Sequence, residues 1–265
     1  MSLAFRSAFA AFVLLALPAH ARELRVCADP DNLPLSHEDG SGFENRIVRV
    51  VAEEMGAELR YEWLRQIRGY VRKTMGEGRC DVFIGVPRDF ERVLATRPYY
   101  RSSYVFVDGP NAEGLQSFED PRLRSLRIGV QLVSDDLAAT PAGHALTAVG
   151  CVDNVTGFPV FGEGPASARM VRAVAAGALD AAIVWGPQAG HFVSRSQSPL
   201  QVRIAQPPPV LQKMPFEFDI AMGVRRGNTA LRDELDAIIE RRRADIDAIL
   251  AAYAVPRTDR PGNAK

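Results

Sequence analysis

The chain has 265 residues, of which 47% are hydrophobic, enough for one large core or two modest ones. Its 32 basic and 32 acidic residues leave a formal net charge of +0. A neutral chain has no overall field to attract nucleic acid or an anionic membrane, so we expect neither nucleic-acid binding nor membrane insertion.

The segment 1–21 is typical of an export signal. Arg6 gives a positive start, residues 8–17 are apolar, and Ala19-His20-Ala21 fits the small-residue cleavage pattern. The apolar run is too short to span a bilayer as a helix. We therefore predict a cleaved signal peptide and an exported mature protein that begins at Arg22.

The stretch 24–47 predicts a strand, a polar loop and a helix. Its first five residues are an apolar run of strand length, and Asp29, Asp31 and Asn32 follow in the loop. In open α/β sheets such a loop forms one wall of a ligand crevice, so these three residues are candidates for a cleft. The competing interpretation is turn chemistry, because Asp, Asn and Pro favour turns by themselves.

The helix that follows has recognisable ends. Ser41-Gly42-Phe43-Glu44 fits a capping box, in which the Ser41 side chain bonds the Glu44 amide and the Glu44 side chain reaches back. Gly56 is the expected helix stop.

The remaining elements alternate between strands and helices. The expected strands are 59–64, 81–86, 101–107, 126–131, 155–161, 180–185, 202–205 and 218–224. The expected helices are 67–75, 87–95, one from about Ser134, one after Gly164-Pro165, 187–194 and one from about Asn228. This order predicts an α/β fold built from two β-α-β units.

The late strand and helix after the proline run 207–209 indicate that the chain returns to complete the first unit. We predict lobe 1 from 22–107 plus 217–255, lobe 2 from 108–216, and a disordered tail at 256–265. A central cleft and two hinge strands would separate the lobes, and hinge closure around a ligand is the expected motion.

The chain has three cysteines, and export makes them candidates for a disulfide. In neighbouring parallel strands, Cys27 and Cys80 would be offset by about 10 Å, too far to bridge unless the strand ends twist together. Cys27–Cys80 is still the favoured pair. The alternative is that these two and Cys151 are all buried thiols.

With these elements placed, the chain resembles type II periplasmic solute-binding proteins of family 3, which is associated with amino-acid importers. Gly42-Phe43-Glu44 matches part of the family's helix signature, although Arg46 stands where a second acid is usual. Longer stretches are similar to one subgroup, the J proteins that accompany quinoprotein methanol dehydrogenases: LRVCADPDNLPLS (24–36), GRCDVFIGVPRDFERVLATRPYYRSSYVFV (78–107) and AAIVWGPQAG (181–190).

This resemblance implies a type II periplasmic-binding-protein fold and a periplasmic, non-catalytic accessory of an alcohol dehydrogenase that depends on pyrroloquinoline quinone (PQQ). The protein would bind the dehydrogenase or a cofactor during maturation, with PQQ as a transient ligand at most. No resident cofactor or metal is expected. The alternative is a receptor that delivers a small carboxylate-bearing ligand to an ABC importer.

The resemblance also indicates which residues face the cleft. Arg92 falls where relatives place the arginine that clamps a ligand carboxylate, although an exposed arginine is the competing interpretation. Relatives carry an aspartate for the ligand's ammonium where this chain has Trp185-Gly186-Pro187. One half of the amino-acid clamp is therefore missing, and an ordinary amino acid is not the expected ligand.

Trp185 is either a cleft aromatic or a core residue. Phe43, Glu44, Tyr104, Gln131 and Gln188 complete the cleft candidates. For Tyr104 and its neighbours Tyr99 and Tyr100, hinge packing is the competing role.

No metal site or enzyme is expected. The histidines lack metal-ligand spacing, and no serine sits in a nucleophile motif.

Overall fold

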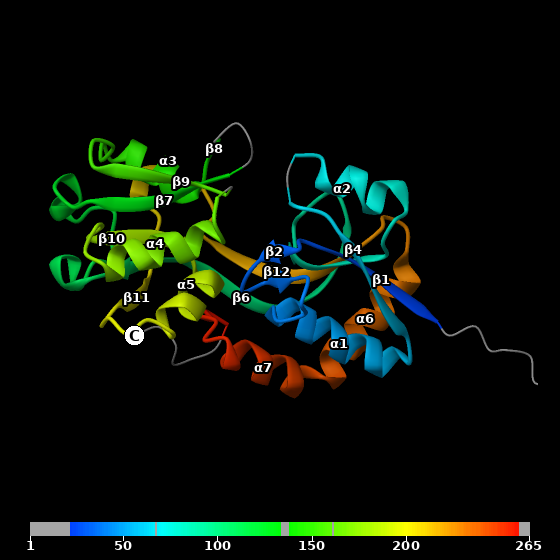
Figure 1. Cartoon of the computed structure of the whole chain (residues 1–265). Coiled ribbons are helices and arrows are strands. Elements are labelled where there is room, and N and C mark those ends of the chain that lie inside the picture. The colour runs from blue at the N-terminus through cyan, green and yellow to red at the C-terminus, as the bar shows by residue number, and fades with distance from the viewer. Residues whose placement is uncertain (1–21, 67, 134–137, 161, 260–265) are drawn as a thin grey trace, which may run out of the picture.

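The structure is a computed structural model that describes residues 22–66, 68–133, 138–160 and 162–259; the expected signal peptide and the expected helix start at Ser134 lie outside them. Two lobes lie side by side, each with a sheet flanked by helices (Figure 1). Among the described residues, no helix combines the length and apolar character needed to cross a membrane.

The strands are β1 (Glu23–Ala28), β2 (Asp31–Asn32), β3 (Ser36–His37), β4 (Glu58–Trp63), β5 (Val82–Pro87), β6 (Leu94–Asp108), β7 (Ile128–Val133), β8 (Ala138–Ala139), β9 (Val155–Pro159), β10 (Ala181–Trp185), β11 (Gln201–Ile204) and β12 (Glu217–Val224). The α-helices are α1 (Phe43–Met55), α2 (Tyr70–Lys73), α3 (Pro141–Ala148), α4 (Ala166–Ala175), α5 (Gly186–Val193), α6 (Thr229–Arg241) and α7 (Arg243–Ala252).

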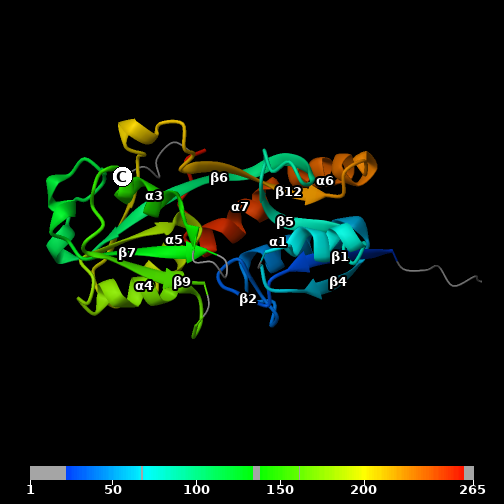
Figure 2. The same cartoon turned by 90° about the horizontal axis from the view of Figure 1, so that it is seen from above.

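One hydrogen-bonded path of strands runs through both lobes, in the order β4-β1-β5-β12-β6-β10-β7-β8, with β11 on β6 and β9 on β7. The path β4-β1-β5 is parallel in lobe 1, and β10-β7-β9 is parallel in lobe 2. Strand β6 belongs to both lobes, because its first part pairs with β12 and its last part with β10 and β11 (Figure 2). The two hinge strands expected from the sequence are therefore present, while the residue at which each lobe ends stays a prediction.

Each lobe has its own hydrophobic core. In lobe 1, the apolar faces of α1, α6 and α7 pack on the sheet through residues such as Phe43, Ile47, Leu235 and Leu250. In lobe 2, separate clusters cover the two faces of the sheet, one around Phe106 and the other around Met170.

The same ion pair occurs at the start of the parallel strands in both lobes. In lobe 1, Arg25 bonds Asp81 with Nε–Oδ2 3.0 Å and Nη2–Oδ1 2.7 Å. In lobe 2, Arg127 bonds Asp180 with the same two distances. Each arginine also donates its backbone N–H to the aspartate, so each pair joins two adjacent strands.

The structure joins Cys27 to Cys80 in a disulfide with a Cα–Cα distance of 5.5 Å. The register sets Cys27 opposite Phe83, which is the three-residue offset expected from the sequence. The backbone bends before β5, where Asp81 donates to the Arg25 carbonyl, and the bend brings Cys80 back over β1. Cys151 is a free, buried thiol in lobe 2.

The helix predicted at 87–95 is wrong. The chain makes a turn there, in which Arg88 donates its N–H to the Asp219 carbonyl of β12. The turn has to carry the chain past β12, because β12 lies between β5 and β6 in the sheet. Asp219 of β12 lies about 130 residues after Arg88 in the chain. A local pattern of polar and apolar residues cannot reveal that such a distant strand pairs with β5.

The predicted capping box is also wrong. Gly42 is the cap residue of α1, and its N–H bonds the Asn45 Oδ1 at 3.1 Å, so Asn45 reaches back in place of Glu44. Glu44 turns inward and is buried. The final helix is divided at Arg242 into α6 and α7. Of the helix expected at 67–75, the described residues form the short helix α2 and the start of a 3-10 turn at Met75.

The first residues of the predicted disordered tail are held in place. Arg257 is only 6% exposed and forms ion pairs with Asp247 and Asp259, while Thr258 donates to the Arg101 carbonyl. A buried guanidinium requires charged partners, so the two ion pairs hold Arg257 in place. Together with the bond to Arg101 of β6, they anchor this segment against the hinge. Residues 260–265 lie outside the described part of the chain.

The end of α7 also meets lobe 2. Tyr253 stacks on His191 of α5, with ring centroids 5.3 Å apart, and its hydroxyl bonds the Ser41 carbonyl of lobe 1. A Cβ at Gly190 would lie 1.9 Å from the Ala254 carbonyl oxygen, so this close approach requires glycine. The C-terminal segment therefore bridges the lobes on the side that carries α1 and α7 (Figure 1).

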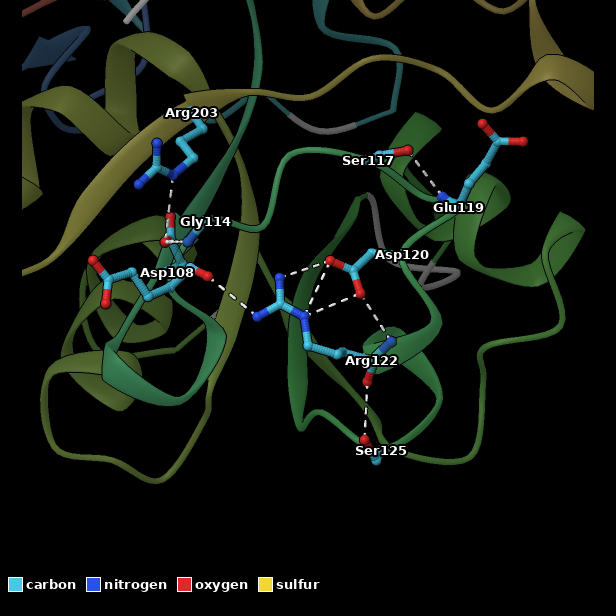
Figure 3. A network of polar contacts seen from close by, with 9 residues as sticks. Asp108, Gly114, Ser117, Glu119, Asp120, Arg122, Ser125 and Arg203 are labelled. Carbon is cyan, nitrogen blue, oxygen red and sulfur yellow. Dashed lines mark hydrogen bonds and ion pairs between the residues drawn. The ribbon is translucent and has the colours of Figure 1, made fainter.

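A polar network holds the segment between β6 and β7 (Figure 3). Asp108 accepts the Gly114 N–H at 3.0 Å and lies 3.6 Å from Arg203, while Asp120 pairs with Arg122 at 2.7 Å. Burial raises the pKa of Asp108 despite the nearby Arg203. These contacts fix a turn and a loop at the start of lobe 2, which is a structural role.

Candidate functional site

A cleft of about 300 Å³ lies between the lobes. Lobe 1 contributes the loop after β1 and the residues after β4. Lobe 2 contributes the end of β7, Val160, Gly162, residues 164–166 and the junction of β10 with α5. Seven of the residues predicted from the sequence line this cleft: Asp29, Asp31, Asn32, Tyr104, Gln131, Trp185 and Gln188.

Hydrogen bonds from backbone amides hold the Asp29 side chain in the loop after β1. Its Oδ1 accepts the Asp31 N–H at 2.9 Å, and its Oδ2 accepts the Gln66 N–H at 2.7 Å. Both carboxylate oxygens therefore bond backbone amides, which joins the loop after β1 to the loop after β4. Asp29 shapes the wall of the cleft, and its two oxygens already have partners.

Asn32 and Gln188 meet across the cleft. The Gln188 Nε2 lies 3.4 Å from the Asn32 Oδ1, which joins β2 of lobe 1 to α5 of lobe 2. The contact is long for a hydrogen bond, so it adds little stability and opens readily. On the lobe 1 side, the Asp31 Oδ2 lies 3.9 Å from the Arg65 Nη2.

The floor of the cleft is aromatic. Trp185 packs edge-on against Tyr104 at 5.6 Å and against Phe218 at 5.7 Å, and Tyr104 packs on Phe216 at 5.7 Å. Trp185 and Tyr104 are also paired residues of β10 and β6. Burial raises the pKa of Tyr104 to about 12, so it stays a neutral phenol. Trp185 is thus both a cleft residue and part of the packing between the hinge strands.

Three predicted cleft residues lie elsewhere. Phe43 is fully buried in the lobe 1 core, where its ring packs against Tyr100 and Tyr253. Arg92 is exposed on the turn after β5 and is not part of the cleft lining. Glu44 is buried beside Gly85 and does not line the cleft itself, although it lines an adjoining hollow together with Tyr104 and Trp185. Placing these side chains requires the turn and the packing of α1, which no local sequence pattern contains.

The sequence prediction missed cleft residues on both sides, among them Arg65 and Gln66 from lobe 1 and Thr140 from lobe 2. A signal for the first two was present, because they follow a predicted parallel strand and the carboxyl ends of such strands meet at one edge. Nothing in the local sequence marks Thr140, whose buried hydroxyl has no hydrogen-bond partner in the described part of the chain.

The charges in the cleft lining all lie in lobe 1. They are Asp29, Asp31 and Arg65, whereas the described lining of lobe 2 is uncharged. A zwitterionic amino acid needs a cation for its carboxylate and an acid for its ammonium, held on facing walls. Helix α5 begins directly after Trp185 with Gly186 and Pro187, so no loop carries an acid there. The cleft therefore lacks this clamp.

PQQ, which the resemblance suggested as a transient ligand, is a planar tricarboxylate. Burying several carboxylates requires several paired cations. Of the described residues that line the cleft, Arg65 is the one cation, and two aspartates lie close to it. These residues do not fit PQQ. In the described part of the chain, no group of three His, Cys, Asp or Glu side chains could hold a metal ion.

Comparison with known proteins identifies the relatives of the chain. The profile of the bacterial extracellular solute-binding proteins, family 3, matches residues 24–255. Protein MoxJ of Methylorubrum extorquens is 37% identical over 89% of this chain and 82% of its own length. Protein MoxJ of Paracoccus denitrificans is 34% identical over 93% of this chain and 94% of its own.

The crystal structure of periplasmic binding protein XoxJ from Methylobacterium extorquens AM1 is also similar. It aligns with a TM-score of 0.73 at 35% identity, covering 88% of this chain and 98% of XoxJ. The predicted periplasmic-binding-protein fold and the resemblance to the J subgroup are both confirmed. The chain belongs to the bacterial extracellular solute-binding proteins of family 3, and within that family it is similar to MoxJ and XoxJ over most of its length.

Proposed function

We propose that this protein is a periplasmic, non-catalytic accessory of a quinoprotein alcohol dehydrogenase, and that it binds the dehydrogenase itself during maturation. The support is the similarity to MoxJ and XoxJ over most of the chain, within a family of extracellular solute-binding proteins. The expected signal peptide agrees with a periplasmic location.

The observation that carries the proposal is the composition of the cleft. A transport receptor for amino acids needs opposite charges on facing lobes, and here the described wall of lobe 2 has none. What remains is a wall of amides, a threonine, glycines and small apolar residues above an aromatic floor. Such groups suit a protein segment, because backbone amides pair with Asn and Gln side chains and apolar side chains pack on tryptophan.

The direct test is a binding titration of the mature protein against the quinoprotein dehydrogenase of the same organism, in its cofactor-free and loaded forms. We expect saturable binding that is tighter to the cofactor-free form. Trp185→Ala and Gln188→Leu should weaken it, and Arg92→Ala is the matched control because Arg92 is exposed outside the cleft.

A deletion strain provides the second test. We expect less PQQ-loaded dehydrogenase in the periplasm when the gene is removed, and recovery when the wild-type gene is restored. A normal amount of loaded, active dehydrogenase in the deletion strain contradicts the proposal.

An importer receptor for a small carboxylate is the second candidate, and Arg65 now favours it in place of Arg92, since Arg65 is the cation that lines the cleft. Calorimetry with a panel of organic acids tests this function. Binding that is lost in Arg65→Ala and kept in Arg92→Ala supports the receptor, and no binding across the panel removes it.

A further inference from the structure

Lobe 1 contains a second cavity, of about 220 Å³, which we call the lobe 1 pocket. It lies between the ends of β1 and β5, helix α2 and the turn after β5, and its walls include Tyr70, Val71, Phe83 and Phe90. Its described lining shares Gln66 with the cleft, and its residues Glu44 and Gly85 also line a hollow that reaches Trp185 of the cleft. An engineered apolar cavity of about 150 Å³ admits benzene, so this volume is sufficient for a small aromatic molecule.

The Glu44 carboxyl forms the polar end of the lobe 1 pocket. Glu44 is 8% exposed, and its buried Oε1 has no hydrogen-bond partner among the described residues. The carboxyl lies against Gly85, where a Cβ would come within 2.0 Å of Oε1. A glycine at this point of β5 therefore gives the carboxyl its place at the pocket. A buried polar atom left without a partner is unfavourable, and a bound ligand is one way to satisfy it.

Among the described residues, no cation contributes to the pKa shift of Glu44, whose one cause is burial. The titratable groups that interact with it are the tyrosines at 61, 70, 99 and 100, and Asp29 faces Tyr70 from the cleft side. Burial raises the pKa of Glu44 to about 8, so the carboxyl is protonated at neutral pH. A protonated carboxyl donates one hydrogen bond and accepts others.

We propose that the lobe 1 pocket binds a small neutral molecule with an aromatic or aliphatic body and a single hydroxyl or carbonyl group, which hydrogen-bonds Glu44. The aromatic walls suit the body of the ligand, and the carboxyl suits its polar group. Anions are excluded because the described lining holds no cation. The proposal does not rest on the dehydrogenase function, and either can fail without the other.

The test is a series of NMR titrations of the full mature protein with phenol, toluene, benzoate and benzylamine as probes. We expect phenol to bind with a dissociation constant in the millimolar range, as expected for a ligand of roughly seven non-hydrogen atoms, and about tenfold more tightly than toluene. Benzoate and benzylammonium should bind more weakly than phenol. Equal affinity for phenol and toluene, tighter binding of benzylammonium, or no binding of any probe overturns the proposal.

Two substitutions of Glu44 give the matched comparison. In wild type, phenol binding should weaken above about pH 8, where Glu44 loses its proton. Glu44→Gln keeps a neutral hydrogen-bonding group, so phenol should still bind this variant, and its binding should not weaken above that pH. Glu44→Leu should remove the preference for phenol over toluene while toluene binding remains. If Glu44→Leu does not fold, Val71→Phe provides the second variant, since it fills the pocket from α2 and should abolish binding of both probes.

Gln131→Ala distinguishes the lobe 1 pocket from the cleft, because Gln131 lines the cleft from lobe 2. Phenol binding should be unchanged in this variant. A loss of binding would place the probe in the cleft and overturn the assignment.

Discussion

The two lobes are alike at one end of their sheets and different at the other. At the amino ends of the strands, Arg25–Asp81 and Arg127–Asp180 have the same two side-chain distances. In both lobes the arginine lies at the start of the first strand, and the aspartate directly precedes a second strand that pairs with it in parallel. In each lobe, this arginine–aspartate ion pair joins two adjacent parallel strands and helps to fix their register.

The carboxyl ends of the same strands diverge. Lobe 1 has the buried Glu44 against Gly85 of β5 there, with no described hydrogen-bond partner for its Oε1, whereas lobe 2 has Trp185 followed at once by α5. In open α/β sheets, ligands bind at the carboxyl ends of the strands. The two lobes therefore share the ion pair at the amino ends of their strands, while the residues at the carboxyl ends differ between them.

The disulfide in lobe 1 should give the largest effect. Cys27→Ala with Cys80→Ala opens a loop with a sequence separation of 53 residues. Chain entropy predicts a loss of about 4 kcal/mol in the free energy of unfolding. Urea denaturation of the oxidised protein and the double variant measures it. Cys151→Ala in lobe 2 is the control, and an equal loss there would contradict a stabilising role specific to the disulfide.

Glu44 should make lobe 1 sensitive to high pH. Its pKa rises from 4.5 to about 8 on folding, so between these values the native state holds a proton that the unfolded chain releases. The free energy of unfolding therefore falls as pH rises through this interval, with a slope of about 1.4 kcal/mol for each step of one in pH and a total of a few kcal/mol.

Glu44→Gln should be more stable than wild type at about pH 9 and differ less at about pH 5. Denaturation curves at both pH values check this, with Glu53→Gln on the exposed face of α1 as control. A variant whose stability falls with pH as steeply as that of wild type would refute the assignment to Glu44.

The two ion pairs should differ in strength. The side chain of Asp180 is 9% exposed and also accepts a bond from Asn111, whereas the side chain of Asp81 is 28% exposed. We expect Asp180→Asn to cost about 2 kcal/mol and Asp81→Asn about 1 kcal/mol.

The hydrogen bonds from Arg127 lower the pKa of Asp180, so its contribution is complete above the unfolded pKa and is lost as pH falls through the native one. Thermal unfolding of both variants at neutral pH compares the lobes directly. Equal losses would show that burial does not distinguish the pairs.

The smallest effect concerns the bridge between the lobes. Burial, with the nearby Arg195, lowers the pKa of His191 from 6.5 to about 4. Protonation therefore favours the unfolded state, and stability falls as pH drops from about 6.5 toward 4.

His191→Phe keeps a ring to stack on Tyr253 and should retain about 1 kcal/mol more stability than wild type near pH 4.5. Chemical denaturation at about pH 4.5 and pH 7 measures this difference. If the variant lost as much stability at about pH 4.5 as wild type, the loss would have to come from groups other than His191.

The sequence by itself determined the framework of this protein. Apolar runs at 24–28, 81–86 and 180–185 predicted buried strands, the second of them parallel, and the late strand at 218–224 indicated a return to lobe 1. Much of the cleft followed as well, since Asp29, Asn32 and Trp185 stand at strand ends. These predictions succeed because hydrophobic period and chain order are local properties of the sequence.

Only the tertiary structure decided which side chains share the cleft. The turn at 88–93, forced by the insertion of β12 between β5 and β6, leaves Arg92 exposed. Asn45, in place of Glu44, caps α1, and Glu44 is buried against Gly85. The physical reason is common to both: each outcome depends on contacts between segments far apart in sequence, whose packing no local pattern records.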